Sequence, residues 1–268
     1  MTEPAPAAFD ALAAGYDART GLLPGVGEAV AESIIAITGA GEQDLLLELG
    51  AGTGEIGASL AQAPVRYLGL DSSPAMLERF RERVAPLQPD LRLADANAPW
   101  PVPDASVAAI VAVRVIHLLH PDHVVREAQR VVQPGGLLLL GHVRRDRDSL
   151  KERLRRRRQQ ALRDAGLPPR QVDAGVRDVL ARCVAAGGED LGARLVVEWT
   201  RAASAAAIFA EWEGMDRMGG HALDATTQAR VLAEVRAWAE AEFGDLDRVE
   251  RCPEMFTLEV IRLPGTGA

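Results

Sequence analysis

The segment LLLELGAGTGEIGASLA, residues 45–61, decides the fold of this chain. Its first five residues are apolar except for Glu48, which is typical of a strand buried on both faces of a parallel sheet. Gly52, Gly54 and Gly57 follow, and glycine allows the positive φ and the close backbone approach of a ligand-binding turn. The segment therefore predicts a strand, a turn that holds a ligand, and a helix. A turn that serves only strand-to-helix packing is the alternative.

The acids near this turn select the kind of ligand. The spacing of Gly52, Gly54 and Gly57 alone matches the fingerprint of nicotinamide- and flavin-binding proteins. Glu48, however, lies at the mouth of the turn, where it would repel a pyrophosphate and attract a cation. Asp71 ends the next expected strand, where an acid can accept hydrogen bonds from ribose hydroxyls. S-adenosylmethionine carries adenosine, a positive charge and no phosphate, so it fits these residues best.

The rest of the chain alternates between short apolar runs and amphipathic stretches, the pattern of βαβ units. Ser73 followed by Pro74 predicts a helix start, because serine caps the free N–H groups and proline fits the first helical position. We therefore expect a Rossmann-like, doubly wound α/β sheet of seven mostly parallel strands with a helical cap insert. The expected strands cover residues 45–49, 66–70, 91–94, 107–113, 137–143, 193–199 and 255–263, and the expected helices 9–38, from 73, from 122, 146–165, 171–186, 202–213 and 225–242.

The organisation changes after the fifth expected strand, where a strongly charged helix interrupts the alternation. We expect three consecutive parts. Residues 1–40 form an N-terminal helical segment over the cofactor site, and 41–145 the Rossmann-like core that binds S-adenosylmethionine. Residues 146–268 form a helical cap together with the last strands of the sheet.

Five motifs, which occur along the chain in the family's order, resemble those of class I S-adenosylmethionine-dependent methyltransferases. LLLELGAGTG is similar to the first motif, E/D-x-G-x-G-x-G, and LGLDSSPAML to the acidic motif after the second strand. LADANAPWPVPDASVAAIVA resembles the third-strand acid with the loop into strand four, and EAQRVVQPGGLLLL the passage into strand five. FDALAAGYD, residues 9–17, is similar to the N-terminal segment of the type 11-like subgroup, which methylates small molecules. The resemblance covers about residues 9–145 and is weak beyond them.

The resemblance implies a role in cofactor binding for each matching position. Glu48, Gly50 and Gly52 would contact the methionine part of the cofactor, and Asp71 would bind the ribose. The adenine would lie against Ser72, Met76, Asp95 and Ala96. Arg114 and His117 would face the sulfonium, and Tyr16 would close over the cofactor. Three of these have alternatives: Asp95 can be a turn acid and Tyr16 a packing residue, and Arg114 stands where a small or polar residue is expected.

A hydroxyl or thiol acceptor needs a base for its proton, and histidine is the usual one near neutral pH. His117, directly after the fourth expected strand, is the leading candidate for a catalytic residue. His120 and His142 are the others. A histidine bonded to the backbone, with no part in proton transfer, is the competing interpretation for each.

Composition narrows the compartment and the partners. The formal net charge of −8 argues against a general nucleic-acid binder and favours a small-molecule acceptor. Cys183 and Cys252 are far apart, which favours buried thiols over a disulfide or a metal site. No apolar run reaches the roughly 18 residues that would span a membrane, and the first residues lack the basic start of a signal peptide. These observations indicate a cytoplasmic protein.

Residues 144–158 hold nine basic side chains against three acids, which leaves a second function open. Such a run can bind RNA, so an RNA methyltransferase is the alternative enzyme. It can equally be a solvated helix whose charges pair at i, i+4, or can attract an anionic acceptor. A regulatory protein that binds the cofactor without transferring a methyl group, and a nicotinamide oxidoreductase, are the remaining interpretations.

Overall fold

The computed structural model describes residues 22–167, 172–215, 218–219 and 221–264. The first part of the expected helix over 9–38 lies outside these residues, as does Tyr16. The described residues belong to two compact units that alternate along the chain. The first unit contains residues up to 142, 172–197 and 256 onward, and the second contains 143–171 and 198–255. The three consecutive parts expected from the sequence stay a prediction.

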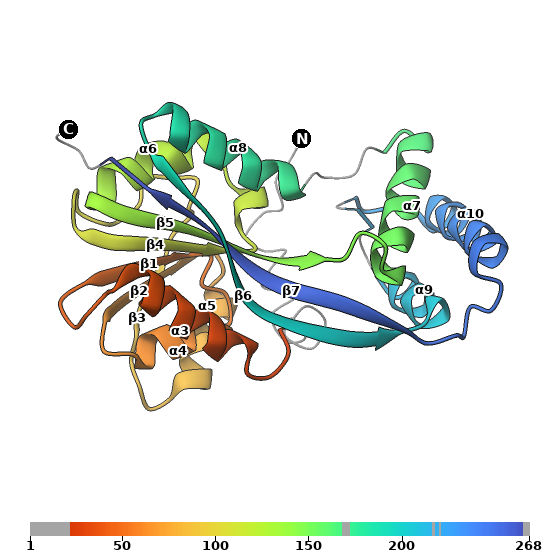
Figure 1. The fold of residues 1–268 in the computed structure, drawn as a ribbon, viewed down its shortest axis with the longest axis horizontal. Coiled ribbons are helices and arrows are strands. Elements are labelled where there is room, and N and C mark those ends of the chain that lie inside the picture. Colours follow the sequence, from red (N-terminus) through yellow and green to blue (C-terminus); the bar gives the residue numbers. More distant parts are fainter. Residues whose placement is uncertain (1–21, 168–171, 216–217, 220, 265–268) are drawn as a thin grey trace. The chain divides into compact units, whose positions relative to one another are not determined.

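A seven-stranded sheet organises the first unit, in the order β3-β2-β1-β4-β5-β7-β6 (Figure 1). The pairs β1–β2, β2–β3, β1–β4 and β4–β5 are parallel. In Figure 1 the β7 arrow points against those of β5 and β6, so the sheet is mixed at this edge. The strands are β1 (Leu45–Leu49), β2 (Arg66–Asp71), β3 (Asp90–Leu93), β4 (Val107–Val113), β5 (Val132–Arg145), β6 (Glu189–Ala203) and β7 (Glu250–Arg262).

The strand order positions the site. The chain moves outward from β1 through β2 to β3 and then returns to place β4 on the other side of β1. Such a reversal leaves a crevice at the carboxyl ends of the two central strands, where open α/β sheets bind ligands. The doubly wound α/β sheet predicted from the sequence is thereby confirmed.

Helices follow the strands and cover their apolar faces. Ser73 accepts a hydrogen bond from the backbone N–H of Met76 and so caps the helix after β2, as its sequence predicts. The helices are α3 (Val26–Thr38), α4 (Gly57–Gln62), α5 (Pro74–Val84), the 3-10 helix η2 (Ile116–Leu118), α6 (Pro121–Val131), α7 (Leu150–Asp164), α8 (Val172–Ala185), α9 (Ala205–Glu213) and α10 (Ala225–Phe243). No described helix is long and apolar enough to cross a membrane.

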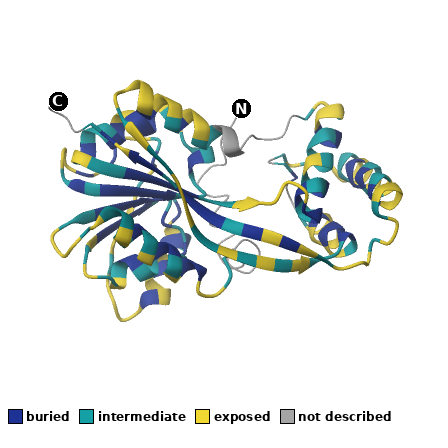
Figure 2. Cartoon of the chain, viewed as in Figure 1, coloured by how far each residue is buried: buried dark blue, intermediate teal, exposed yellow. Residues whose placement is uncertain are grey.

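The core of the first unit lies between the sheet and the helices, and the burial colours of Figure 2 follow it along the central strands. Leu46, Leu47 and Leu49 are fully buried, as a strand covered on both faces requires. Helix α8 belongs to this unit, where it packs against α6 and η2. Its Cys183 is buried in the core, and this burial raises the pKa of the thiol to about 11.

The second unit has its own core, formed by apolar residues of α7, α9 and α10. Phe209 and Trp212 meet edge to face in it, with ring centroids 5.7 Å apart. Cys252 is buried there as well, and both cysteines are free thiols. The strands β5, β6 and β7 are longer than the sequence indicates, and each continues from the first unit into the second. Most of the added length of β5 lies before residue 137, within the first unit.

Gly54 tests how tightly the turn after β1 is packed. Its φ is +79°, and a Cβ there would lie 2.4 Å from Cδ2 of the buried Phe80. Gly54→Ala is expected to lower the free energy of unfolding by about 2–5 kcal/mol, since a left-handed backbone costs alanine about 1–2 and overpacking about 1–3 kcal/mol. Urea unfolding followed by circular dichroism measures this loss.

Gly135→Ala is the matched control. Gly135 has nearly the same φ, +78°, but no heavy atom lies within 4 Å of the position of its Cβ. Its replacement should cost only the backbone preference, about 1–2 kcal/mol. Equal losses for the two variants would show that the contact between the turn and Phe80 is not tight.

Candidate functional site

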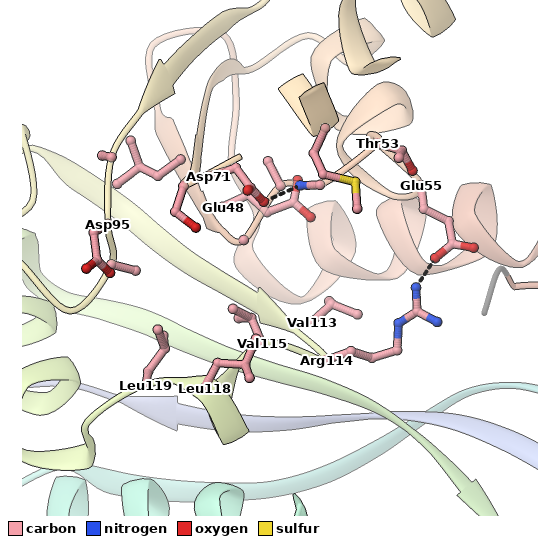
Figure 3. Close-up of a pocket in the computed structure, with 18 of the residues that line it drawn as sticks. Glu48, Thr53, Glu55, Asp71, Asp95, Val113, Arg114, Val115, Leu118 and Leu119 are labelled. Carbon is pink, nitrogen blue, oxygen red and sulfur yellow. Dashed lines mark hydrogen bonds and ion pairs between the residues drawn. The ribbon is translucent and has the colours of Figure 1, made fainter. Parts of the chain in front are cut away.

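A cavity of about 360 Å³ opens at the carboxyl ends of β1, β2 and β4 in the first unit. Figure 3 shows Asp95 at one end of it, Glu55 and Arg114 at the other, and Glu48 with Asp71 between them. Nine of the predicted binding residues line it: Glu48, Gly50, Gly52, Asp71, Ser72, Met76, Asp95, Ala96 and Arg114. The lining also includes residues that the sequence did not single out: Ala51, Thr53, Glu55, Ile56, Leu70, Ala94, Asn97, Val113, Val115, Leu118 and Leu119.

The glycine turn brings its backbone to the cavity wall. Gly50 and Gly52 have φ values of +67° and +54°, which favour glycine. A Cβ on Gly50 would lie 2.6 Å from Cγ2 of Val115, so the turn after β1 approaches the end of β4 closely. At Gly57 a Cβ would lie 2.4 Å from Oε2 of Glu48. These positions need glycine because neighbouring groups occupy the space of a side chain.

Asp71 is held in one orientation at the end of β2. The backbone N–H of Gly52 donates to its Oδ2 at 2.8 Å, and that of Ser73 donates to its Oδ1 at 2.9 Å. Hydrogen bonds from backbone N–H groups to a carboxylate are charge-assisted and therefore stronger than neutral ones. The predicted ribose acceptor is thus fixed against the glycine turn before any ligand arrives.

Glu48 is almost completely buried, with 4% of its surface exposed. The hydroxyl of Tyr67 donates to its Oε2 at 2.5 Å. Burial raises the pKa of the Glu48 carboxyl, the bond from Tyr67 lowers it, and the nearby Asp71 and Glu55 raise it; together they bring it to about 8. Burial and Glu48 also raise the pKa of the Tyr67 hydroxyl. A positively charged ligand group would relieve this repulsion, because an opposite charge favours the ionised carboxylate.

Arg114 forms an ion pair with Glu55 at one end of the cavity (Figure 3). Its φ of +56° is rare for a residue with a side chain, and its backbone N–H donates to the carbonyl of Gly141 on β5 at 3.1 Å. Glu55 also accepts a hydrogen bond from the backbone N–H of Leu22. Glu55 therefore joins the tip of β4 to the segment before α3.

Asp95 makes a turn at the opposite end of the cavity. Its Oδ1 accepts a hydrogen bond from the backbone N–H of Asn97 at 2.8 Å, so Asp95 stabilises a turn, as the alternative interpretation expected. Asp95 also lines the cavity. The Asn97 amide donates to the carbonyl of Leu118 at 3.1 Å, and its Oδ1 accepts from the N–H of His120 at 2.8 Å. Asn97 thereby joins the loop after β3 to the one after β4.

His117 does not line the cavity; its neighbours Leu118 and Leu119 do. Its Cα lies 3.4 Å from the position of a Cβ on Gly175, so this part of η2 packs on α8. His142 lies on β5 beside β7, with Nε2 3.3 Å from the hydroxyl of Thr257 and 4.0 Å from a carboxylate oxygen of Glu259. A role as base stays a prediction for both histidines.

Comparison with known proteins places this site in a family. Residues 47–140 match the family model described as a methyltransferase domain. Over these residues the chain is similar to a methyltransferase domain. Among relatives, 27-O-demethylrifamycin SV methyltransferase of Amycolatopsis mediterranei is 39% identical to the chain over 105 residues, which is 37% of this chain and 38% of the relative. Demethylmenaquinone methyltransferase of Chlamydia trachomatis is 35% identical over 133 residues, 48% of this chain and 57% of the relative.

The chain is also similar in fold to solved structures. Geranyl diphosphate methyltransferase in complex with SAM has a TM-score of 0.52 over 93% of this chain and 90% of that chain, at 15% identity, and so shares the fold. The chain spans less than two thirds of the curated relatives described above. The part that matches the family model, residues 47–140, reaches from within β1 to within β5 and includes every described residue that lines the cavity.

Replacement of Glu48 in the methyltransferase domain tests the charge of the site. A carboxyl with a pKa raised to about 8 favours the folded state below its ordinary value of 4.5, and this contribution is lost as the pH rises to 8. Glu48→Gln has no such dependence. Its stability relative to the wild type should therefore increase between pH 5 and pH 8, by up to about 1.4 kcal/mol per pH unit.

Urea unfolding at several pH values measures this difference. Glu78→Gln removes an exposed carboxylate on α5 and serves as the control. If the difference between Glu48→Gln and the wild type stays constant from pH 5 to pH 8, the Glu48 carboxyl does not carry a raised pKa.

Proposed function

We propose that this protein is an S-adenosylmethionine-dependent methyltransferase that acts on a small molecule. The observation that carries the proposal is the charge of the cavity. Glu55, Asp71 and Asp95 line it together with the buried Glu48, and Arg114 is the one basic residue among the described residues of the lining. Such a site attracts a cationic nucleoside and disfavours the pyrophosphate of a dinucleotide.

The residues divide along the cavity according to the parts of the cofactor. Asp71 would accept hydrogen bonds from the ribose hydroxyls, and Glu48, with the turn at Gly50 and Gly52, would hold the methionine part. The adenine would lie between the two loops that Asn97 joins, against Ser72, Met76, Asp95, Ala96 and Leu118. Arg114, paired with Glu55, would face the sulfonium side. Tyr16 as a residue that closes over the cofactor stays a prediction.

When bound, S-adenosylmethionine supplies a methyl group on a positively charged sulfur, with a neutral thioether as the leaving group. The residues of this chain would bind the cofactor and the acceptor, orient them and exclude water. Good orientation of two reactants contributes roughly 7–11 kcal/mol to the lowering of a barrier. Asp71, with its fixed orientation, and the rigid glycine turn would orient S-adenosylmethionine. A base is needed only if the acceptor loses a proton, and the proposal assigns none.

Two observations support a small-molecule acceptor over RNA. The named relatives act on a rifamycin and on demethylmenaquinone. In the second unit, the guanidinium of Arg157 pairs with Glu234 at 2.8 Å and that of Arg153 with Glu242 at 2.5 Å, while Arg158 stacks on the ring of Trp212. Several arginines of this run therefore interact with residues of the second unit itself. The proposal includes a cytoplasmic location, which the two free thiols support.

Cofactor binding is tested by calorimetry with S-adenosylhomocysteine and with NAD. The wild type should bind S-adenosylhomocysteine and not NAD. Asp71→Asn should raise the Kd for S-adenosylhomocysteine about tenfold or more, because a charge-assisted hydrogen bond contributes about 1.5–3 kcal/mol. Asp90→Asn, which removes an exposed carboxylate paired with Arg92 on β3, should leave the Kd unchanged. Binding of NAD alone would refute the proposal, and an unchanged Kd in Asp71→Asn would remove Asp71 from the site.

Methyl transfer is tested separately, with S-adenosylmethionine that carries a labelled methyl group. The full chain is incubated with a small-molecule cell extract in one arm and with total RNA in the other. We expect label in the small-molecule arm, and its loss together with cofactor binding in Asp71→Asn. Label in RNA alone would establish the RNA methyltransferase. Binding of the cofactor without label in either arm would favour the regulatory protein.

A further inference from the structure

A cluster of basic side chains in the second unit has no part in the proposed methyl transfer. It surrounds Glu254 on β7, which has 3% of its side chain exposed. Nε of Arg145 donates to Oε1 of Glu254 at 2.9 Å, and Nζ of Lys151 lies 3.5 Å from the same oxygen. Nε of Arg201 and the indole N–H of Trp199 donate to Oε2 at 3.1 Å and 2.8 Å. Side chains from β5, β6 and α7 thus meet at one carboxylate.

The cluster contains more positive than negative charge. Among the described residues, Arg145 and Lys151 pair with no acid other than Glu254, so these two cations alone exceed its charge by one. Burial would raise the pKa of the Glu254 carboxyl, but Arg145, Lys151 and the bond from Trp199 lower it overall, so the acid is ionised near neutral pH. The side chains of Arg145, Lys151 and Arg201 remain 38%, 25% and 35% exposed. Glu254 therefore fixes the cations in place without withdrawing them from solvent.

Two of the cations have donors to spare. Arg145 uses only Nε for Glu254, and its two terminal nitrogens make no hydrogen bond within the part of the chain that the structure describes. The ammonium of Lys151 makes a hydrogen bond only to Glu254 among the described residues, at the long distance of 3.5 Å. A guanidinium presents a planar pair of N–H groups that matches two oxygens of a carboxylate or a phosphate. An ammonium adds a point charge beside it.

We propose that Arg145, Lys151 and Arg201, held by Glu254, form a binding site for the phosphate or carboxylate group of a small ligand. The site lies within the second unit and does not depend on the cofactor, so it stands or falls independently of the proposed methyl transfer. Nucleic acid is disfavoured because Arg153, Arg155 and Arg157 of α7 are paired with carboxylates, which interrupts a continuous basic face.

The chain offers a specific reporter, since Lys151 is its single lysine. We would measure the rate at which an acetylating reagent modifies Lys151 in the full chain, by mass spectrometry of the peptide that contains it. A lysine-containing standard peptide in the same tube corrects for reagent consumption. The additions are pyrophosphate, citrate and a short RNA, each compared with sodium chloride of equal ionic strength. Pyrophosphate or citrate should slow the acetylation at least severalfold, and the stronger of the two identifies the preferred oxyanion.

Variants tie the protection to the cluster. Arg145→Gln should weaken protection by about tenfold in anion concentration, since it removes charge-assisted hydrogen bonds. Arg201→Gln should weaken it as well, and replaces the first variant if that one fails to fold by circular dichroism. Arg153→Gln is the matched control: it removes one charge from α7, where Arg153 pairs with Glu242 and stacks on Phe243, and should keep full protection.

Three outcomes would overturn the proposal. One is an acetylation rate that neither pyrophosphate nor citrate changes. Another is protection that both Arg145→Gln and Arg201→Gln retain. The third is protection by RNA alone, which would identify the surface as one for nucleic acid. Binding of S-adenosylhomocysteine, measured on the same samples, reports on the proposed function separately.

Discussion

One hydrogen bond, from the backbone N–H of Gly52 to the carboxylate of Asp71, determines the geometry of the site. It joins the turn after β1 to the end of β2, which are adjacent parallel strands. The turn can reach Asp71 only because Gly50 and Gly52 adopt positive φ, and it can stay there only because Gly54 and Gly57 leave room for Phe80, Tyr67 and Glu48. The backbone conformation of the turn, its packing and the orientation of Asp71 therefore depend on one another.

That arrangement places acids where burial disfavours their negative charge. Tyr67 donates a hydrogen bond to Glu48, and this single short bond does not compensate fully for the burial of the carboxyl. Asp71 and Glu55 add to the repulsion. Near neutral pH the empty site therefore holds Glu48 mostly in its protonated form, and a ligand that brings a positive charge favours the ionised form. A cofactor that loses its charge when it reacts suits such a site, because the product is held less strongly than the reactant.

The sequence predicted those parts of the molecule that local signals specify. These signals are the glycines after a buried strand, the acid at the end of the next strand, and Ser73 before Pro74. Each of them determines the structure of only a few neighbouring residues, and the structure places all of them as expected. It did not reveal the ion pair between Glu55 and Arg114, which are 59 residues apart. Nor did it show that α8 belongs with the sheet, or that Leu118 and Leu119 rather than His117 reach the cavity, because tertiary packing decides both.

The second unit is built from two parts of the chain that are distant in sequence. It consists of residues 143–171 and 198–255. The first supplies α7 and the second supplies α9 and α10, yet all three helices bury their apolar residues in the same core. Helices α9 and α10 contact each other within the second of these segments, and α7 packs against both of them. The core of the second unit is therefore complete only when both segments of the chain are present.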